Sequence, residues 1–179
     1  GAFEVTLVQG NDEFILVDAA DDISAQIITR VEGGILKIYT SPKFKSPAKV
    51  LLTINFKSLD AIGCAGAIVI NSSGALKFDK LSFDASGACK TKIELTASSL
   101  EMDISGAGNA TLSGSVTKVD LDISGAGKFM AGSMEVEDYE IDISGAGNAE
   151  VKASNTLDVD MSGTGNVRYN GNPKITKDV

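Results

Sequence analysis

The segment LEMDISGAGNATL, at residues 100–112, recurs with small changes along the second half of this 179-residue chain. Each copy contains a Ser-Gly pair, and the serines of five copies are Ser86, Ser105, Ser124, Ser144 and Ser162. They lie 19, 19, 20 and 18 residues apart, and a degenerate sixth copy occupies residues 62–66. A repeat this short cannot bury its apolar face alone, so the copies must stack on one another.

The alternation within each copy is that of a β-strand. Leu100, Met102 and Ile104 fall on one side of the chain, and Glu101 and Asp103 fall on the other, which is the two-residue period of a strand. A Gly-Ala-Gly turn, a second short strand and a polar link of variable length follow. The sequence therefore predicts an all-β fold, a right-handed parallel β-helix-like solenoid of about 19-residue coils that rise about 4.8 Å each.

The turns of this solenoid are expected to depend on backbone conformation. The first glycine of each turn should adopt a positive φ, which other residues resist. These glycines are Gly87, Gly106, Gly125, Gly145 and Gly163. Asn109, Asn148 and Asn166 follow the turns, where asparagine tolerates the left-handed region and stacks amide on amide. Lys90 and Lys128 interrupt this asparagine ladder.

Residues 1–56 have a different pattern, with five strand-like segments and a Gly33-Gly34 pair that is typical of a tight hairpin. We expect this part to be antiparallel and to cap the solenoid, with a loop at residues 41–47. Because no linker is long enough to separate two units, we predict a single domain over residues 1–179, made of a strand-rich section (1–56) and the β-helix repeats (57–179). Residues 170–173 predict a turn that blunts the last edge.

Composition excludes several classes of function. The chain has 24 Asp+Glu against 16 Lys+Arg, a net charge of −8, which argues against nucleic acid or an anionic lipid surface as a partner. It has no His, which removes His-based acid–base catalysis and most zinc sites. No apolar run reaches the roughly 18 residues that a bilayer span requires, so we expect no direct membrane insertion.

Carboxylates are concentrated on the outward side of the repeated strand. The pairs are Glu101/Asp103, Asp120/Asp122, Glu140/Asp142 and Asp158/Asp160. Like charges in neighbouring coils, about 4.8 Å apart, destabilise a sheet. Local hydrogen bonds, solvent and raised pKa values would relieve them, as would a basic partner surface or a divalent cation such as Ca²⁺, which favours several carboxylate oxygens. Asp103, Asp122 and Asp142 are the candidate metal ligands, and Ca²⁺ is the only candidate cofactor.

The same carboxylates raise the question of glycoside hydrolysis, which uses pairs about 5 Å or 6.5–9.5 Å apart. Any ladder of aspartates produces such distances automatically. The chain has no Trp, and Tyr39, Tyr139 and Tyr169 are its only tyrosine platforms for a sugar ring. We therefore assign no catalytic residues and expect a protein that is not an enzyme.

Cys64 and Cys89 fall on adjacent coils but two columns apart. Straight-strand geometry separates their Cα atoms by roughly 8 Å, beyond the usual disulfide limit near 7 Å. We therefore expect two unpaired small residues at Gly-like turn positions. A bent turn would bring them close enough to bond, and an oxidising compartment would then favour the disulfide.

The repeated Ile-Ser-Gly-Ala-Gly-Asn, at residues 104–109 and 143–148 and in altered form at 161–166, follows a strand-rich entry that ends in VEGGILKI (31–38). Over nearly the whole chain this pattern resembles the bacterial head GIN domain family, described as auto-transporter adhesin heads. The resemblance implies a right-handed β-helix-like fold, export through a cleaved signal, and a periplasmic, outer-membrane-attached or extracellular location in Bacteroidetes-like bacteria. It implies no established activity and no family catalytic residues.

Together, the repeat and the resemblance predict an exported, non-enzymatic β-helix module. It would act as an adhesin or cell-surface scaffold whose ligand, a glycan or a protein, the sequence does not identify. The alternative is a polysaccharide-binding or polysaccharide-active β-helix protein.

Overall fold

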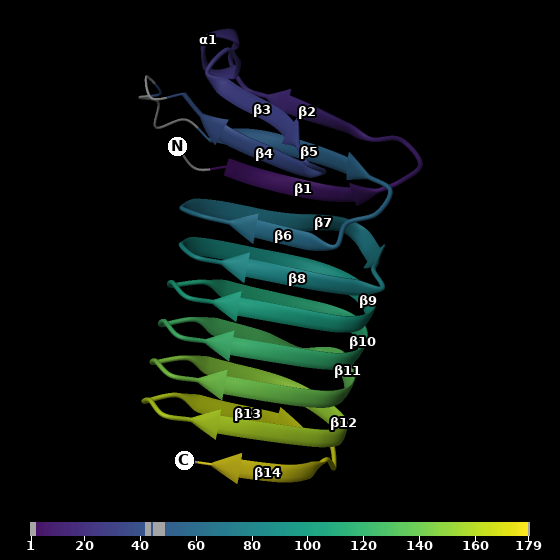
Figure 1. The fold of residues 1–179 in the computed structure, drawn as a ribbon, viewed down its shortest axis with the longest axis vertical. Helices are drawn as coiled ribbons and strands as arrows, with labels where there is room; N and C mark the ends of the chain where they lie inside the picture. The colour runs from purple at the N-terminus through teal and green to yellow at the C-terminus, as the bar shows by residue number, and fades with distance from the viewer. Residues whose placement is uncertain (1–2, 42–43, 45–48, 179) are drawn as a thin grey trace.

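The computed structural model describes residues 3–41, 44 and 49–178. The chain forms a parallel β-solenoid of about six turns, visible as stacked coils in Figure 1. This confirms the all-β solenoid predicted from the repeat. The strands are β1 (Phe3–Gln9), β2 (Phe14–Asp18), β3 (Ile27–Glu32), β4 (Ile35–Thr40), β5 (Val50–Phe56), β6 (Ala61–Cys64), β7 (Ala67–Lys77), β8 (Lys80–Ala85), β9 (Ala88–Ile104), β10 (Asn109–Ile123), β11 (Lys128–Ile143), β12 (Asn148–Met161), β13 (Asn166–Asn170) and β14 (Lys174–Asp178), and a short helix α1 spans Asp21–Ser24.

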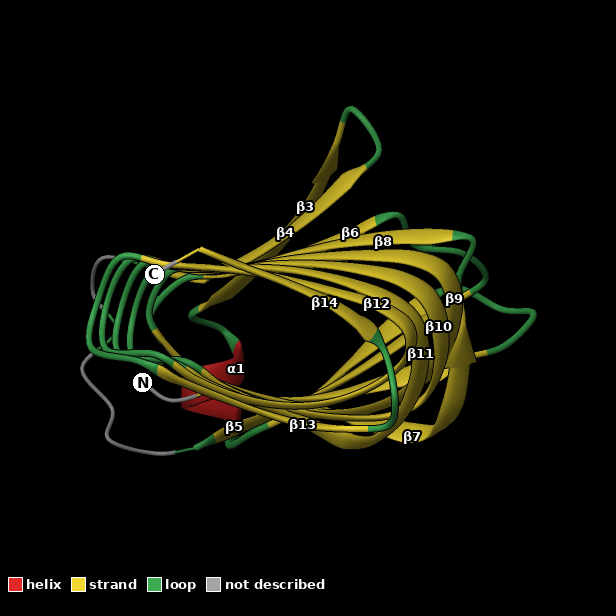
Figure 2. Ribbon diagram, turned by 90° about the horizontal axis from the view of Figure 1, so that it is seen from below, coloured by secondary structure: helices red, strands yellow, loops and turns green. Residues whose placement is uncertain are grey.

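Each coil is flattened, with two long sides. Figure 2 shows the sides joined by tight turns at one edge and by a bend at the other, through which β9 to β12 run without interruption. Successive strands pair in parallel with residues of equivalent repeat position opposite one another. The register shifts where the chain bends, for example between Thr111 and Ser113 and between Met130 and Val136. The bend therefore absorbs the changes in repeat length, as expected of the variable link.

Apolar side chains fill the space between the two sides. Leu121, Ile123 and Phe129 have no exposed surface, and their equivalents in neighbouring coils are buried as well. Burying such side chains contributes roughly 1.5–3 kcal/mol each, so the stacked interior is the main source of stability. Because the interior is packed, any ligand must bind to the outer faces or the edges of the solenoid.

The N-terminal section continues the solenoid as well as capping it. β1 pairs in parallel with both β5 and β7, and β2 pairs antiparallel with β5. β3 and β4 form a separate antiparallel hairpin that leaves the flattened cross-section (Figure 2). Gly33 and Gly34 turn this hairpin with φ of +58° and +79°, which confirms the prediction from the Gly-Gly pair. The loop expected at residues 41–47 lies largely outside the described residues.

At the other end of the molecule, residues 170–173 connect the two sides of the last coil. β13 and β14 both pair in parallel with β12, so the chain turns here and continues as β14 instead of ending at a blunted edge. Gly171 makes this turn with a φ of +104°. Every residue of β14 is exposed.

The turn glycines do not adopt the positive φ expected of them. In the described part of the chain, positive φ occurs only at Gly33, Gly34, Gly66, Gly74, Gly114 and Gly171, and at no other residue type. The turns require glycine for a different reason, because a Cβ on Gly145 would lie 2.9 Å from the backbone oxygen of Ser124 in the coil before.

The asparagines that follow the turns are likewise not left-handed. Asn109, Asn148 and Asn166 begin strands. Asn148 and Asn166 stand opposite each other in the register, so the ladder reflects strand pairing and not a special backbone conformation.

Close stacking at the turns predicts that Gly145→Ala destabilises the protein. The added methyl group must displace the backbone of the preceding turn, and overpacking of this kind costs about 1–3 kcal/mol. Gly63→Ala is the matched control, because a Cβ there meets nothing within 4 Å, and it should change stability by less than about 0.5 kcal/mol. Urea unfolding of both variants measures the difference, and equal stabilities would contradict the steric explanation.

Candidate functional site

One side of the solenoid presents two adjacent columns of carboxylates, which we call the acidic face. Strand register stacks the first column as Asp84, Asp103, Asp122, Asp142, Asp160 and Asp178. The second column consists of Glu101, Asp120, Glu140 and Asp158. Both columns are exposed, and together they place ten carboxylates on β8 to β12 and β14.

Local interactions relieve part of this repulsion. Lys118 donates to Glu140 at 3.2 Å, one column away from the carboxylate pairs. Partial burial of its carboxyl group raises the pKa of the largely exposed Asp122 above its ordinary value, and the neighbouring Asp103 and Asp120 carboxylates raise it further. The pKa of Asp142 is raised in the same way, first by burial and then by the surrounding carboxylates. Protonation of Asp122 and Asp142 and the contact of Lys118 with Glu140 can therefore both reduce the repulsion between the carboxylates.

The three candidate metal ligands occupy one column but do not converge. Asp103, Asp122 and Asp142 stand opposite one another in successive coils. Among the described residues, however, no three His, Cys, Asp or Glu side chains are grouped so that they could hold a metal ion. The column instead offers one carboxylate per coil, and Ca²⁺ binding stays a prediction.

The opposite side carries a different chemistry, and we call its two central columns the amide face. One column is Lys90, Asn109, Lys128, Asn148 and Asn166, and the other is Lys92, Thr111, Met130, Glu150 and Arg168. Lys128, Met130 and Arg168 help to line a shallow hollow of about 260 Å³ on this face. In the sequence, Lys90 and Lys128 are visible only as interruptions of an asparagine ladder. The amide face was not predicted, because the residues that surround these lysines in the sequence differ from coil to coil.

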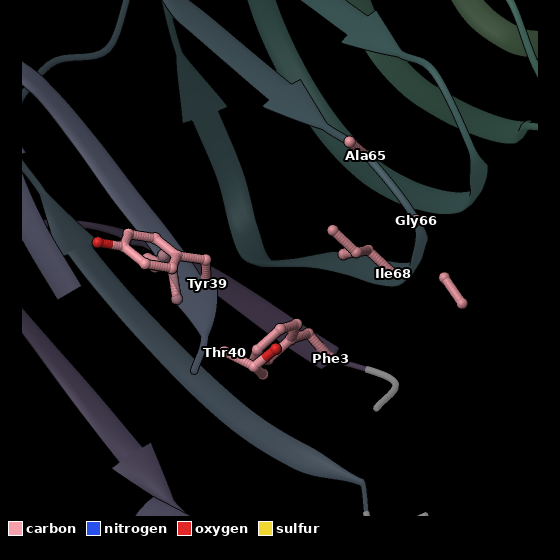
Figure 3. Close-up of a pocket in the computed structure, with 8 residues that line it drawn as sticks. Phe3, Tyr39, Thr40, Ala65, Gly66 and Ile68 are labelled. Atoms are coloured by element: carbon pink, nitrogen blue, oxygen red, sulfur yellow. The ribbon is translucent and has the colours of Figure 1, made fainter. Parts of the chain in front are cut away.

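A second hollow, of about 230 Å³, lies between the hairpin and the first turn (Figure 3). Phe3, Tyr39 and Ile68 contribute apolar surface to it. Tyr39 is 40% exposed and Tyr169, in the last coil, is 47% exposed. Tyr139 is buried, and its hydroxyl has no hydrogen-bond partner among the described residues, so it is not available as a sugar platform.

Cys64 and Cys89 form a disulfide, and the expectation that they are unpaired is wrong. Their Cα atoms lie 6.6 Å apart, because the turn closes the coil and brings its two sides together. In later coils the isoleucine before one turn faces the second glycine of the next turn: a Cβ on Gly127 would lie 2.6 Å from a methyl carbon of Ile104. Cys64 takes the isoleucine place and Cys89 the glycine place, so the disulfide joins the first two coils.

Reduction of this disulfide is expected to destabilise the protein by about 2–4 kcal/mol, because the bond closes a loop of 25 residues in the unfolded chain. Urea unfolding with and without dithiothreitol measures the loss. The variant Cys64→Ile with Cys89→Gly copies the later coils, so it should retain more stability than a double serine variant and should not respond to the reductant. Equal stability of oxidised and reduced wild type would contradict the assignment.

The raised pKa values predict a pH-dependent gain from removing charge. Asp122→Asn with Asp142→Asn should raise the melting temperature at neutral pH, where the charged carboxylates oppose folding. The gain should shrink as the pH falls through the folded-state pKa values towards the unfolded-state values, because wild type then takes up the stabilising protons. Thermal melts across a pH series test this. Asp12→Asn with Glu13→Gln, outside the acidic face, is the control, and an equal gain from it would contradict the explanation.

The cation prediction is tested by thermal melts with EDTA, Mg²⁺ and Ca²⁺ at matched ionic strength. Binding to the native state raises stability by RT ln(1 + [L]/Kd), so a Ca²⁺ site on the acidic face would show itself as a rise in the melting temperature of wild type that is specific to Ca²⁺. The variant Asp103→Asn with Asp122→Asn and Asp142→Asn should lose this response. Identical wild-type melts in EDTA and Ca²⁺ would mean that the acidic face is a solvated surface without a cation site.

Solved structures share this fold over almost the entire chain. A putative adhesin from Bacteroides fragilis superposes with a TM-score of 0.90 at 23% identity, covering 98% of this chain and 85% of that chain. A putative adhesin from Parabacteroides distasonis gives a TM-score of 0.77 at 22% identity, covering 99% of this chain and 85% of the other. A putative lipid binding protein from the same species gives 0.74 at 20% identity, with coverages of 98% and 87%.

The chain has no match among curated proteins, and no described helix is long and apolar enough to cross a membrane. The family model named "Putative auto-transporter adhesin, head GIN domain" matches residues 1–173. This description and the names of two neighbours indicate an adhesin or surface protein, and none of these names is that of an enzyme. The resemblance seen in the repeated Ile-Ser-Gly-Ala-Gly-Asn is thereby confirmed, and the chain belongs to the head GIN domain family.

Proposed function

We propose that the protein is an exported, non-enzymatic adhesion module that presents its flat outer faces to a ligand on another surface. The observation that carries this proposal is the packed interior. Buried side chains occupy the space between the two sides of each coil, and the two hollows are shallow depressions of the surface. Recognition therefore takes place on broad, regular sheet faces, a geometry that suits adhesion better than the enclosed pockets of most enzymes.

Export is supported by the disulfide and the family description. Disulfides persist in the periplasm and outside the cell, and they are rare in the reducing cytosol. Cys64 and Cys89 are both buried and bonded to each other, and the family is described by the term auto-transporter adhesin. Lysis of producing cells in denaturant that contains a maleimide tests this: the two unfolded cysteines should react only after a reductant is added, whereas reaction without a reductant would contradict export to an oxidising compartment.

Catalysis is not part of the proposal. The carboxylates of the acidic face repeat at every coil, so no pair is distinguished from the others as an acid and a base. The second candidate function is polysaccharide binding without hydrolysis, and the amide and hydroxyl groups of the opposite side favour it, because such groups form hydrogen bonds with sugar hydroxyls.

Adhesion is tested with beads coated with the folded protein and applied to epithelial cells and to immobilised mucin. Coated beads should adhere more than beads coated with albumin, which is also acidic. Incubation of soluble polysaccharides with the protein, followed by an assay for new reducing ends, tests catalysis. Absence of adhesion to every surface, or release of reducing ends, would overturn the proposal.

A further inference from the structure

The amide face stands out in the distribution of charge. Its two columns hold Lys90, Lys92, Lys128 and Arg168 against a single carboxylate, Glu150, although the whole chain has a net charge of −8. The carboxylates are concentrated instead on the acidic face, on the other side of the solenoid. The amide face is therefore a cationic surface on an anionic protein.

Within the described part of the chain, these cations have no ion-pair partner. Lys118 and Lys152 form ion pairs with Glu140 and Glu135. By contrast, none of the four cations of the amide face forms an ion pair with any carboxylate in the described ranges. Unpaired, exposed cations on one face attract an anionic ligand without first breaking an internal salt bridge.

Hydrogen-bonding groups lie between the cations. Asn109, Asn148, Asn166 and Thr111 are exposed on the same two columns. In the described structure, no side-chain hydrogen bond engages these four residues. Lys128, Asn148, Asn166 and Arg168 also surround the 260 Å³ hollow. The hollow thus combines two cations and two amides with the single carboxylate of Glu150, and Thr111 adds a hydroxyl elsewhere on the face.

The spacing of these groups favours a polymer. Groups recur along the solenoid axis at the coil rise of about 4.8 Å, so Lys90 and Lys128, two coils apart, are separated by about 10 Å. A ligand with a repeating unit can contact successive coils in the same way, and several weak contacts then add up to useful avidity. The two columns contain no aromatic residue, whereas single-stranded nucleic acid binding relies on aromatic stacking.

We propose that the amide face binds an acidic polysaccharide, a chain of sugars that carries carboxylate or sulfate groups, laid along the solenoid axis. Lys90, Lys92, Lys128 and Arg168 pair with its anionic groups, and the asparagines and Thr111 bond its hydroxyls. This inference rests on the proposed adhesive function and names the chemical class of its ligand.

The test compares two variants of equal net charge. The amide-face variant carries Lys90→Asn, Lys92→Thr, Lys128→Asn and Arg168→Thr. The control variant carries Lys77→Thr, Lys80→Ser, Lys118→Ser and Lys174→Thr. Every substitution copies a residue found in the same column of a nearby coil, so both variants should fold, and circular dichroism and thermal melts confirm it before binding is measured.

The probes are dextran sulfate, uncharged dextran, polygalacturonate, polyglutamate and a single-stranded oligonucleotide, with affinities measured at low and near-physiological salt in the presence of EDTA. Wild type and the control variant should bind dextran sulfate and polygalacturonate, and not dextran. The amide-face variant should bind them about tenfold or more weakly, since it loses four charged contacts that act together. Added salt should weaken wild-type binding.

Four results would overturn the inference: no binding to either acidic polysaccharide, equal binding by the two variants, equal binding of dextran and dextran sulfate, or tighter binding of polyglutamate or the oligonucleotide. The bead assay separates this inference from the proposed function. Wild-type adhesion that persists in the amide-face variant would overturn the inference and leave the adhesive function standing. Polysaccharide binding by a protein whose beads do not adhere would overturn the adhesive function alone.

Discussion

The fold depends on the contact between the backbones of successive turns. At each turn the glycine of one coil lies so close to the coil before it that a Cβ has no room, and Ala126 donates its backbone N–H to the oxygen of Gly106 at 3.1 Å. This contact holds neighbouring coils in one register. Once the register is set, every position of the repeat becomes a column, so the chemistry of each face follows from which residue type the repeat places there.

The register has opposite effects inside and outside the solenoid. Inside, it stacks apolar residues of similar position, and the buried columns that contain Leu121 and Ile123 are continuous. Outside, it stacks carboxylates that repel one another, and these add to partial burial in raising the pKa of Asp142. From Ile104 onwards, an isoleucine of one coil contacts the second glycine of the next turn, whereas between the first two coils the Cys64–Cys89 bond takes the place of this contact. A covalent link thus substitutes for side-chain packing where the repeat is degenerate.

Periodicity made most of the fold predictable, because strand alternation and coil length are both visible in one dimension. The solenoid, the inward columns and the carboxylate columns all follow from it, and the Gly33-Gly34 pair predicted the hairpin. The role of the turn glycines did not follow, because close approach between coils is a property of the stack and not of one turn. The disulfide was missed for a related reason, since straight strands overestimate distances across a closed turn. The amide face was missed because Lys128 and Arg168 lie 40 residues apart in the chain, and only the register brings them to the same hollow.

The bend lies at the edge of the coils opposite the turns. It allows the number of residues in a coil to change while the register of the strands on both faces stays the same. Because irregularities between Thr111 and Ser113 and between Met130 and Val136 are confined to this edge, residues gained or lost there leave the columns on both faces aligned. The bend is therefore the place where related chains can diverge in length without disturbing a binding surface. For the same reason, duplication of one whole coil would lengthen both faces by about 4.8 Å while each existing column kept its order. A protein built in this way can change the reach of its surface in coil-sized steps.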